Sequence, residues 1–338
     1  MNYYILNIKP ENYGFPLKKA IVKKIKKYSE DGKLRLASIT SGRGCYGRCD
    51  FCAAANLMRR NFSPNYVVNH MEYLIRTYDV NAFNFTESLT LSTRKWVEEF
   101  CNEIIGRELK IFYIALARAD FNYDEETIKL LEDSGCIILG FGFESGDNLM
   151  LRSFNKKTTV ERYYKILNDF KKTSIAVGGS FILNMPGEHY NSIKNTIEFI
   201  KNTKIVFTFG FAYPYPGSSL YRFAETNSFC NLDDVMFKEL NKRITSRQSF
   251  EEYINKFNFN NLSKEEIWKV DKLFFRLSDY NYLYNKNILL YFLIRTFPFY
   301  FIIKKGFVYL KNLIYIFLRK VAKFLKIKKL IHGLKFKK

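Results

Sequence analysis

The sequence has few residues of several kinds. Only 7 of its 338 residues are proline and 17 are glycine, while 47% are hydrophobic and 17% are aromatic, which excludes a disordered, collagen-like or low-complexity chain. Acidic residues are absent from 281–338, a segment that holds 14 of the 54 lysine and arginine residues. Residues 1–33 carry a further net charge of +5, so the middle, 34–280, contributes only +2 of the overall +21. We therefore do not expect nucleic acid as a partner.

Features of a secreted protein are also missing. Residues 1–10 lack the basic start, the long apolar run and the small-residue cleavage site of a signal peptide. We therefore expect a cytoplasmic, reducing location in which disulfides do not form. Three of the six cysteines stand apart among apolar residues and are interpreted as buried structural thiols: Cys101, Cys136 and Cys230.

Strand and helix patterns alternate through the middle of the chain. Six apolar runs predict strands at 34–40, 82–85, 110–116, 136–143, 176–183 and 205–212. Helical patterns lie between them at 63–78, 92–107, 124–134, 159–172 and 190–202, with a further amphipathic helix at 15–29. Strands that are apolar throughout are typical of a parallel sheet covered on both faces. An open doubly wound sheet and a partial barrel of six units both fit, since a closed barrel needs eight.

Polar and glycine-rich segments follow the carboxyl ends of these strands. They are the loop 41–52, Thr86-Glu87, Arg118, residues 144–146, residues 186–188 and Pro216-Gly217. In both candidate folds, function belongs at the carboxyl ends of parallel strands. The convergence of these segments on one edge of the sheet predicts an active site there.

Three cysteines crowd into the loop Ser41-Gly-Arg-Gly-Cys45-Tyr-Gly-Arg-Cys49-Asp-Phe-Cys52. Thiolates are soft ligands for zinc or iron–sulfur clusters, and three of them reach three corners of a cubane and leave the fourth iron open. A structural zinc site needs a fourth ligand nearby, but the sequence has only three histidines and no second close pair of cysteines. Arg43 and Arg48 would offset the negative charge of a cluster. A zinc knuckle and three unrelated thiols are the alternatives.

The Cys-x3-Cys-x2-Cys motif, with an aromatic residue before its last cysteine, closely resembles that of the radical S-adenosylmethionine (SAM) superfamily. Six further segments continue the resemblance in order across roughly residues 34–225. They are residues 85–90, 118–120, 140–146, 155–156, 181–188 and 213–221. In detail they are most similar to the class that usually carries a cobalamin-binding domain in front.

The resemblance implies a 4Fe–4S cluster held by Cys45, Cys49 and Cys52, with SAM chelating the open iron through its amino and carboxylate groups. It implies that one electron, from a flavodoxin- or ferredoxin-like donor, cleaves SAM to methionine and a 5′-deoxyadenosyl radical. That radical would abstract a hydrogen from the substrate, while the barrel orients the partners and excludes water. No side chain is expected to be catalytic, because the radical derives from the cofactor.

The resemblance also implies cofactor-binding roles for four side chains. Phe51 would lie against the adenine, and Arg118 would bind a carboxylate or another anion. Glu87 and Glu144 would approach the SAM amino group or the ribose hydroxyls. The structural alternatives are core packing for Phe51, a strand-end salt bridge for Glu144, and pairing of Arg118 with Asp120 or Glu87. Their shared position at one edge favours the functional interpretation.

The sequence departs from the family pattern in several places. Only 44 residues precede Cys45, whereas about 150 residues of cobalamin domain precede the cluster in that class, and no histidine lies in an Asp-x-His-x-x-Gly setting. We therefore expect no cobalamin site within this chain, unless a partner supplies the cofactor. The absence of a second trio of cysteines argues against sulfur insertion. Asn184 stands where the family often has Gly, and Thr86 where it often has Asp.

The last part of the chain is apolar and basic at once. Residues 288–303 are very apolar, but they contain Arg295 and Pro298 and fall short of the roughly 20 residues that a spanning helix needs. Beyond residue 306 one helical face is apolar: Leu310, Leu313, Ile314, Phe317, Val321, Phe324 and Leu325. The opposite face is basic: Lys311, Arg319, Lys323 and Lys326. This pattern is typical of a helix in an anionic membrane interface, and packing on the barrel is the alternative.

These patterns predict an α/β chain built on a partial (β/α)6 TIM-like barrel. A basic lead-in helix at 1–33 precedes the radical SAM core at 34–225, which a helical extension at 226–285 and a basic amphipathic tail at 286–338 follow. The expected function is that of a radical SAM enzyme, cytoplasmic and peripheral to a membrane, acting on a lipid-linked substrate, a peptide or a secondary metabolite. A non-catalytic zinc- or iron–sulfur-binding scaffold at the membrane surface is the alternative from a different class.

Overall fold

Six parallel strands stand side by side in the order in which they occur in the chain. The computed structural model describes residues 5–13, 15–227, 247–260 and 262–285. The strands are β2 (Leu34–Ile39), β5 (Ala82–Phe85), β6 (Phe112–Ala117), β7 (Cys136–Glu144), β8 (Ala176–Leu183) and β9 (Val206–Phe211). A seventh strand, β1 (Leu6–Ile8), pairs antiparallel with β2 at the edge of the sheet. All six predicted strands are confirmed.

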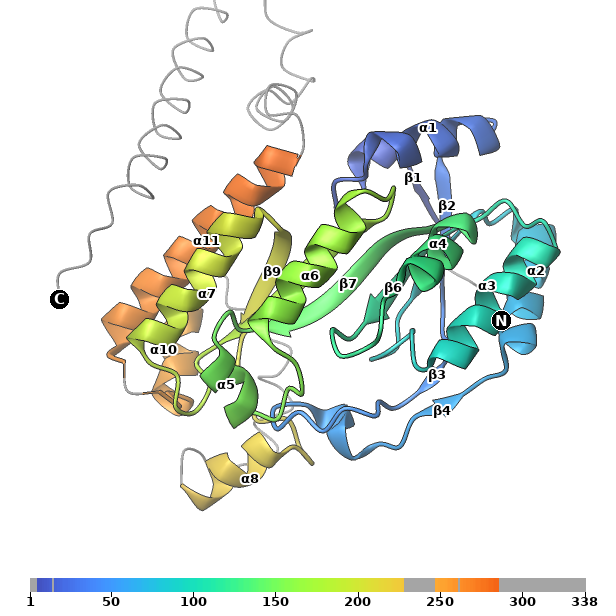
Figure 1. Cartoon of the computed structure of the whole chain (residues 1–338). Coiled ribbons are helices and arrows are strands. Elements are labelled where there is room, and N and C mark those ends of the chain that lie inside the picture. Colours follow the sequence, from blue (N-terminus) through green and yellow to red (C-terminus); the bar gives the residue numbers. More distant parts are fainter. Residues whose placement is uncertain (1–4, 14, 228–246, 261, 286–338) are drawn as a thin grey trace, which may run out of the picture.

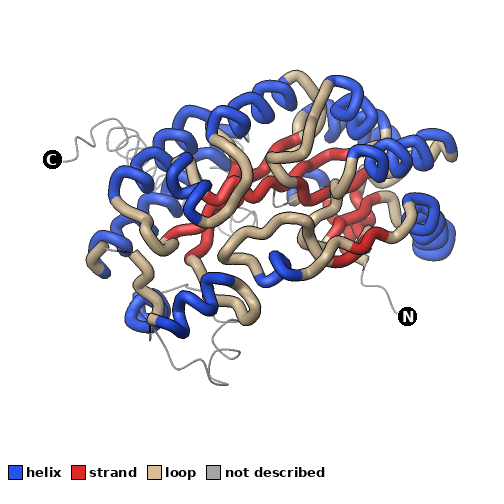
Figure 2. Tube along the Cα trace, turned by 60° about the horizontal axis from the view of Figure 1, so that its bottom comes forward, coloured by secondary structure: helices blue, strands red, loops and turns tan. Residues whose placement is uncertain are grey.

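This strand order decides between the two candidate folds. Right-handed crossovers that never reverse direction place every connecting helix on the same face of a sheet, whereas a doubly wound sheet needs a reversal. The connecting helices are α2 (Pro64–Tyr78), α3 (Arg94–Gly106), α4 (Glu125–Asp133), α6 (Val160–Lys171) and α7 (Tyr190–Thr203). They lie along the outside of a curved sheet (Figures 1 and 2). The partial barrel is therefore confirmed.

Side-chain caps explain where the outer helices begin. In four of them, a side-chain oxygen of the residue before the helix accepts a hydrogen bond from the backbone N–H three residues later, which satisfies an otherwise unpaired donor. These cap residues are Ser63, Thr93, Asp124 and Thr159. At α7 the cap is His189, whose Nδ1 accepts from the Ser192 N–H at 3.1 Å.

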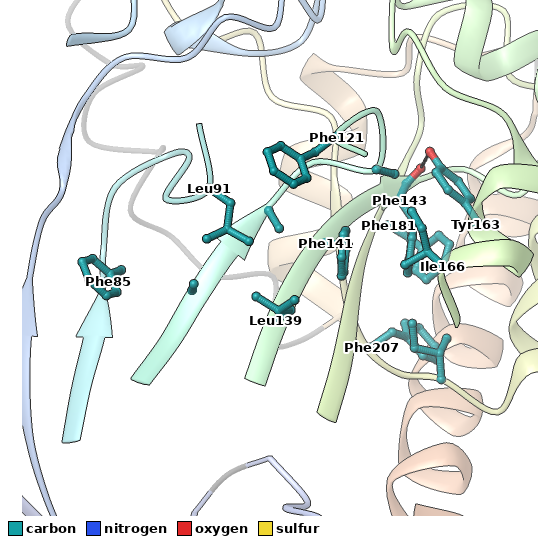
Figure 3. Packing of buried hydrophobic residues seen from close by; sticks show 14 of the residues in the cluster. Phe85, Leu91, Phe121, Leu139, Phe141, Phe143, Tyr163, Ile166, Phe181 and Phe207 are labelled. Carbon is teal, nitrogen blue, oxygen red and sulfur yellow. Dashed lines mark hydrogen bonds between the residues drawn. The ribbon is translucent and has the colours of Figure 1, made fainter. Parts of the chain in front are cut away.

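Aromatic side chains fill the space between the sheet and the outer helices. Phe141 and Phe143 of β7 and Phe181 of β8 are buried there, and Phe143 packs against Tyr163 of α6 with 4.4 Å between ring centroids (Figure 3). The Tyr163 hydroxyl donates to the Phe143 carbonyl at 2.7 Å, so this buried polar group is satisfied. This outer core holds the strands in place and leaves their opposite face available for a site.

The isolated cysteines behave as expected where they are described. Cys101 and Cys136 are fully buried in the outer core, and burial raises the pKa of the Cys101 thiol to about 11. Such thiols stay protonated and unreactive at neutral pH. Cys230 lies outside the described residues.

The opposite, concave face is closed at the amino ends of the strands by the start of the chain. Helix α1 (Lys19–Tyr28) buries Ile21 and Ile25 there, as the amphipathic pattern predicted. Together they form a second apolar core with residues of β2, β5, β6, β7 and β8: Leu34, Leu36, Ala82, Phe112, Ile114, Ile137, Ile138 and Ala176. The rest of the concave face lines the cavity described below.

Several short elements were not predicted. They are β1, the two-stranded ribbon of β3 (Gly42–Arg43) and β4 (Arg60–Asn61), the 3-10 turns η1 (Pro10–Asn12) and η2 (Ala53–Asn56), and helices α5 (Asn148–Ser153) and α8 (Ser219–Thr226). The β3–β4 ribbon and η2 belong to the cysteine loop and its continuation.

Two helices after the barrel cover its last strand. They are α10 (Arg247–Lys256) and α11 (Lys264–Asn285). Phe274 of α11 packs on Phe207 and Phe209 of β9, and the Ser278 hydroxyl donates to the Phe207 carbonyl at 2.9 Å. The predicted tail, 286–338, lies outside the described residues. Within the described ranges, no helix combines the length and apolar character that crossing a membrane requires.

Candidate active site

A cavity of about 650 Å³ extends along the concave face, from the cysteine loop at the carboxyl edge to Gly178 and Val206 near the amino ends of β8 and β9. Six of the seven predicted site residues line it: Cys45, Cys49, Phe51, Cys52, Arg118 and Glu144. They come from the loop after β2, the end of β6 and the end of β7, which the parallel sheet brings to one edge. Glu87 is not among the lining residues, although its neighbour Ser88 is.

The cysteine loop is folded by close backbone contacts that only glycine permits. The Cys45 N–H donates to the Leu57 carbonyl at 3.0 Å, so the chain after η2 lies directly over the first cysteine. Gly44 has φ +80°, and a Cβ on it would lie 2.5 Å from the carbonyl oxygens of Leu57 and Met58. The Gly47 N–H donates to Cys45 Sγ at 3.3 Å, and the Cys52 N–H donates to the Cys49 carbonyl at 3.0 Å.

Arg118 joins the cysteine loop to the end of β6. Its guanidinium forms a fork with the Asp120 carboxylate, with Nη2–Oδ2 at 2.7 Å and Nε–Oδ1 at 2.9 Å, and its Nη1 lies 3.5 Å from Cys49 Sγ. Burial lowers the pKa of Arg118, but the hydrogen bonds to Asp120 and Cys49 outweigh burial and raise it overall. A Cβ on Gly47 would lie 2.0 Å from Arg118 Nη1, so glycine makes room for this contact. Arg118 therefore pairs with Asp120, the structural alternative, and at the same time contacts the cysteine loop of the site.

Glu144 ends β7 in an uncommon backbone conformation. Its φ is +64°, and its carboxylate forms a buried ion pair with Lys156, with Oε1–Nζ at 2.8 Å. The Lys156 ammonium also lies 6.0 Å from the centre of the Phe51 ring, which packs edge-on against Phe154. A Cβ on Gly142 would lie 2.1 Å from Glu144 Oε1, so the strand leaves space for this carboxylate. Strained backbone of this kind persists where the surroundings enforce it, often at functional sites.

Glu87 faces the cysteine loop from the other side. Its Oε1 accepts hydrogen bonds from the Ser41 N–H at 3.1 Å and from the Ser41 hydroxyl, and Arg59 donates to that hydroxyl at 2.9 Å. Its Oε2 is buried with no hydrogen-bond partner among the described residues. A buried, unpartnered carboxylate oxygen beside the site is costly unless another group binds it. The predicted role of Glu87 in binding SAM stays a prediction.

The sequence did not assign a role to three parts of this site. Lys156 lies within the segment 155–156 of the family resemblance, but its partner, Glu144, is 12 residues away and only the fold brings them together. Gly140 and Gly178 pair across β7 and β8 and form a cavity floor without side chains. In the sequence they lie within apolar runs that indicated strands only. Phe15, which covers Gly178 from inside the barrel, lies far away in the sequence.

The donor set fits an iron–sulfur cluster better than a polar ligand. Three thiols and the Arg118 guanidinium gather at one end of the cavity, and glycines keep the loop backbone close. In the part of the chain that the structure describes, no three His, Cys, Asp or Glu side chains are grouped as a single metal ion requires. The three-cysteine ligand set is thus still a prediction.

Comparison with known proteins decides the family. A sequence model of the radical SAM superfamily matches residues 39–200, which span the sheet from β2 to α7 and include the cysteine loop. The chain belongs to the radical SAM superfamily. This membership implies a 4Fe–4S cluster and SAM as cofactors.

Curated relatives match over the radical SAM core. An uncharacterized methyltransferase of Pyrococcus horikoshii is 27% identical over 206 residues, which are 60% of this chain and 44% of that protein. The anaerobic magnesium-protoporphyrin IX monomethyl ester cyclase of Rubrivivax gelatinosus is 28% identical over 192 residues, 56% of this chain and 35% of that protein. The bacteriochlorophyllide d C-8(2)-methyltransferase of Chlorobaculum tepidum is 25% identical, over 65% of this chain and 51% of that protein. The match thus spans between a third and a half of the length of these relatives.

Solved structures support the fold. The cobalamin-dependent SAM radical enzyme OxsB, with aqua-cobalamin and SAM bound, has a TM-score of 0.51 and 14% identity over 88% of this chain and 50% of its own. The radical SAM methyltransferase TsrM from Kitasatospora setae, with cobalamin and a 4Fe–4S cluster bound, has a TM-score of 0.52 and 18% identity over 58% of this chain and 38% of its own. The expected absence of a cobalamin site within this chain stays a prediction.

Proposed function

We propose that this enzyme cleaves SAM reductively and uses the resulting 5′-deoxyadenosyl radical to abstract a hydrogen from an apolar substrate. The observation that carries the proposal is that one cavity joins the three cysteines to an apolar, glycine-floored surface. When bound, a reduced 4Fe–4S cluster supplies the electron that breaks the carbon–sulfur bond of SAM.

The side chains at the carboxyl edge bind and orient the partners. Cys45, Cys49 and Cys52 hold the cluster, and Arg118 offsets the thiolate charge through its contact with Cys49. Glu144, paired with Lys156, accepts hydrogen bonds from hydroxyl or ammonium groups of SAM. Phe51 offers a ring face or edge to the adenine beside Lys156. The chain thus contributes binding, orientation and exclusion of water, while the cofactor supplies the chemistry.

The deeper part of the cavity favours an apolar substrate. Gly140 lies four residues before Glu144, or about 13 Å along the strand, and leaves a floor without side chains beside Gly178. The walls there are mostly aliphatic and aromatic: Phe15, Ile114, Leu116, Ile138, Val206 and Phe207. Its cationic lining groups, Arg118 and Lys156, are already paired with Asp120 and Glu144. A hydrophobic body fits this surface better than a phosphorylated or acidic one, and a lipid-linked substrate also suits the basic tail.

The test is an anaerobic assay of purified, iron- and sulfide-loaded full-length protein. We expect dithionite and SAM to yield 5′-deoxyadenosine, and we expect an organic-solvent extract of cells to raise its rate more than the aqueous fraction does. Cys49→Ala is expected to abolish the product. A protein that binds zinc in place of iron, or that carries a full cluster but forms no 5′-deoxyadenosine, would instead support the non-catalytic scaffold. S-adenosylhomocysteine, measured in parallel, reports methyl transfer of the kind named for two of the relatives.

A further inference from the structure

The β3–β4 ribbon places two arginines directly opposite each other. Arg43 of β3 and Arg60 of β4 are register partners, and side chains in such a pair have Cβ atoms about 4.5–5.5 Å apart. Both are exposed, and like charges directly opposite each other are destabilising. In the described part of the chain, no carboxylate forms an ion pair with either guanidinium. A ribbon of two residues per strand therefore keeps an unfavourable pair that an anionic partner would relieve.

The cysteine loop and its continuation carry a local excess of positive charge. Residues 41–62 contain four arginines and a single acid, Asp50, so they hold +3, while all of 34–280 sums to +2. Three of the four arginines, Arg43, Arg48 and Arg60, are exposed, and Arg48 also has no ion-pair partner among the described residues. The ribbon and the cysteine loop thus present exposed positive charge that no carboxylate of the described residues neutralises.

Exposed apolar side chains lie between these arginines in the sequence and against the cysteine loop in space. Leu57 is 58% exposed and Met58 is 82% exposed. Their backbone carbonyls pack on Gly44, and the Leu57 carbonyl accepts the Cys45 N–H at 3.0 Å. An apolar centre with methionine and a rim of arginine is the composition of a protein interface.

We propose that the ribbon surface, made of Arg43, Arg48, Leu57, Met58 and Arg60, is the docking site of an acidic protein that donates single electrons. The inference rests on the proposed function, because the enzyme needs one electron per SAM cleaved. The donor loses one electron and the cluster gains it, with no proton or group transferred. This surface is one hydrogen bond from the Cys45 backbone, so a protein seated on it lies close to the predicted cluster. A nucleic acid is disfavoured because the rest of the middle carries no net positive charge.

The first measurement is binding, which does not depend on activity. Oxidised flavodoxin, an acidic flavoprotein, is immobilised and its Kd for the full-length protein is measured at low and at 300 mM salt. We expect the ribbon variant, Arg43→Glu/Arg60→Glu, to raise that Kd at least tenfold at low salt. Salt at 300 mM should also raise the Kd of the unchanged protein, because the attraction is electrostatic. Met58→Ser is expected to raise the Kd severalfold at both salt concentrations. Arg60→Glu alone should raise Tm slightly, by pairing with Arg43, and still weaken binding, which a merely structural role would not predict.

The matched control is Lys19→Glu/Lys23→Glu, the same charge change on exposed positions of α1 at the opposite end of the barrel (Figure 1). This variant is expected to bind flavodoxin like the unchanged protein. In the activity assay, reduced flavodoxin and dithionite are compared as electron sources. The ribbon variant should lose at least tenfold of its flavodoxin-driven rate and keep its dithionite-driven rate within twofold.

Two results would overturn the docking site. In one, the ribbon variant binds flavodoxin as tightly as the unchanged protein does. In the other, the ribbon variant loses affinity for a 20-nucleotide RNA while its flavodoxin binding stays intact. If the unchanged protein binds flavodoxin through the ribbon but forms no 5′-deoxyadenosine with dithionite, the proposed function fails while the docking surface stands. The two proposals therefore fail in different assays.

Discussion

At the scale of single residues, the site depends on a charge pair that is almost removed from water. Lys156 and Glu144 are 5% and 7% exposed, with 2.8 Å between Nζ and Oε1. A buried ion pair of this kind stabilises the fold little more than two apolar residues in its place would. Removal of one partner, however, leaves the other charge buried and uncompensated. The geometry also ties the positive φ of Glu144 to the position of its carboxylate.

We therefore expect Lys156→Met to lower the free energy of unfolding by about 3–5 kcal/mol and to weaken SAM binding. The control is Lys157→Met, which removes an exposed lysine at the next position and should change stability by less than about 0.5 kcal/mol. Denaturant unfolding of both variants measures the difference, and equal losses would show that the ion pair contributes no more than a surface charge. Lys156→Met/Glu144→Gln should recover part of the loss.

A residue that looked like a departure from the family pattern has a physical reason in the fold. Asn184 stands where glycine is frequent, and its φ is +65°, a region that glycine and, less easily, asparagine adopt. Its buried side chain donates to the Tyr253 hydroxyl at 3.0 Å and accepts from the Phe259 N–H at 3.2 Å. Asparagine thus adopts the positive φ of the turn and also connects the barrel to the helical extension through hydrogen bonds. The sequence showed the unusual residue but not its partners, which are about 70 residues away.

At the scale of elements, local patterns were sufficient where an element is long and its neighbours are adjacent in the chain. The six parallel strands and their outer helices have apolar runs, periodic faces and capping residues, so their positions were predictable. β1 and the β3–β4 ribbon have two or three residues each and exist because of what they pair with. The same holds for the site: the cysteine spacing is local, whereas the Glu144–Lys156 pair and the glycine floor need the sheet.

The turn after β8 contains a carboxyl group whose ionisation opposes folding. Glu188 is 3% exposed, and burial raises its pKa from 4.5 to about 8, despite hydrogen bonds from the Asn184 N–H and the Asn260 side chain. In the unfolded chain the group ionises near its ordinary pKa. Between pH 4.5 and 8 the folded state therefore binds more protons than the unfolded state, and stability falls as the pH rises.

We expect Glu188→Gln to remove this dependence. At pH 5 the variant and the unchanged protein should differ little, whereas at pH 8 the variant should be more stable by roughly 3–5 kcal/mol. Denaturant unfolding from pH 5 to 9 measures this, with Glu198→Gln on the exposed side of α7 as the control that leaves the pH profile unchanged. A Glu188→Gln profile parallel to that of the unchanged protein would mean that the carboxyl group is ionised in the folded state.

At the scale of the whole molecule, charge divides the chain into parts with different partners. Residues 34–280, which include the barrel, carry a net charge of only +2, as suits a cavity for a cofactor and an apolar substrate. The last 53 residues, 286–338, hold 14 lysine and arginine residues and no acid. An unbalanced basic segment of this size, with an apolar helical face in its sequence pattern, is suited to an anionic lipid surface.

We propose that the tail brings the full-length enzyme to such a surface, and we expect it to sediment with vesicles of phosphatidylcholine and phosphatidylglycerol but not with phosphatidylcholine alone. Each basic residue near an anionic surface contributes about 1 kcal/mol, so replacement of Lys311, Arg319, Lys323 and Lys326 by Glu should weaken binding on the order of 1,000-fold. Lys19→Glu/Lys23→Glu serves again as the control and should bind as before. Salt at 500 mM should release the protein if charge dominates, because the Debye length then falls below about 5 Å. Equal binding to neutral vesicles, or binding that survives the four replacements, would assign the tail to another role and leave the substrate of the barrel to be sought among molecules that are not in a membrane.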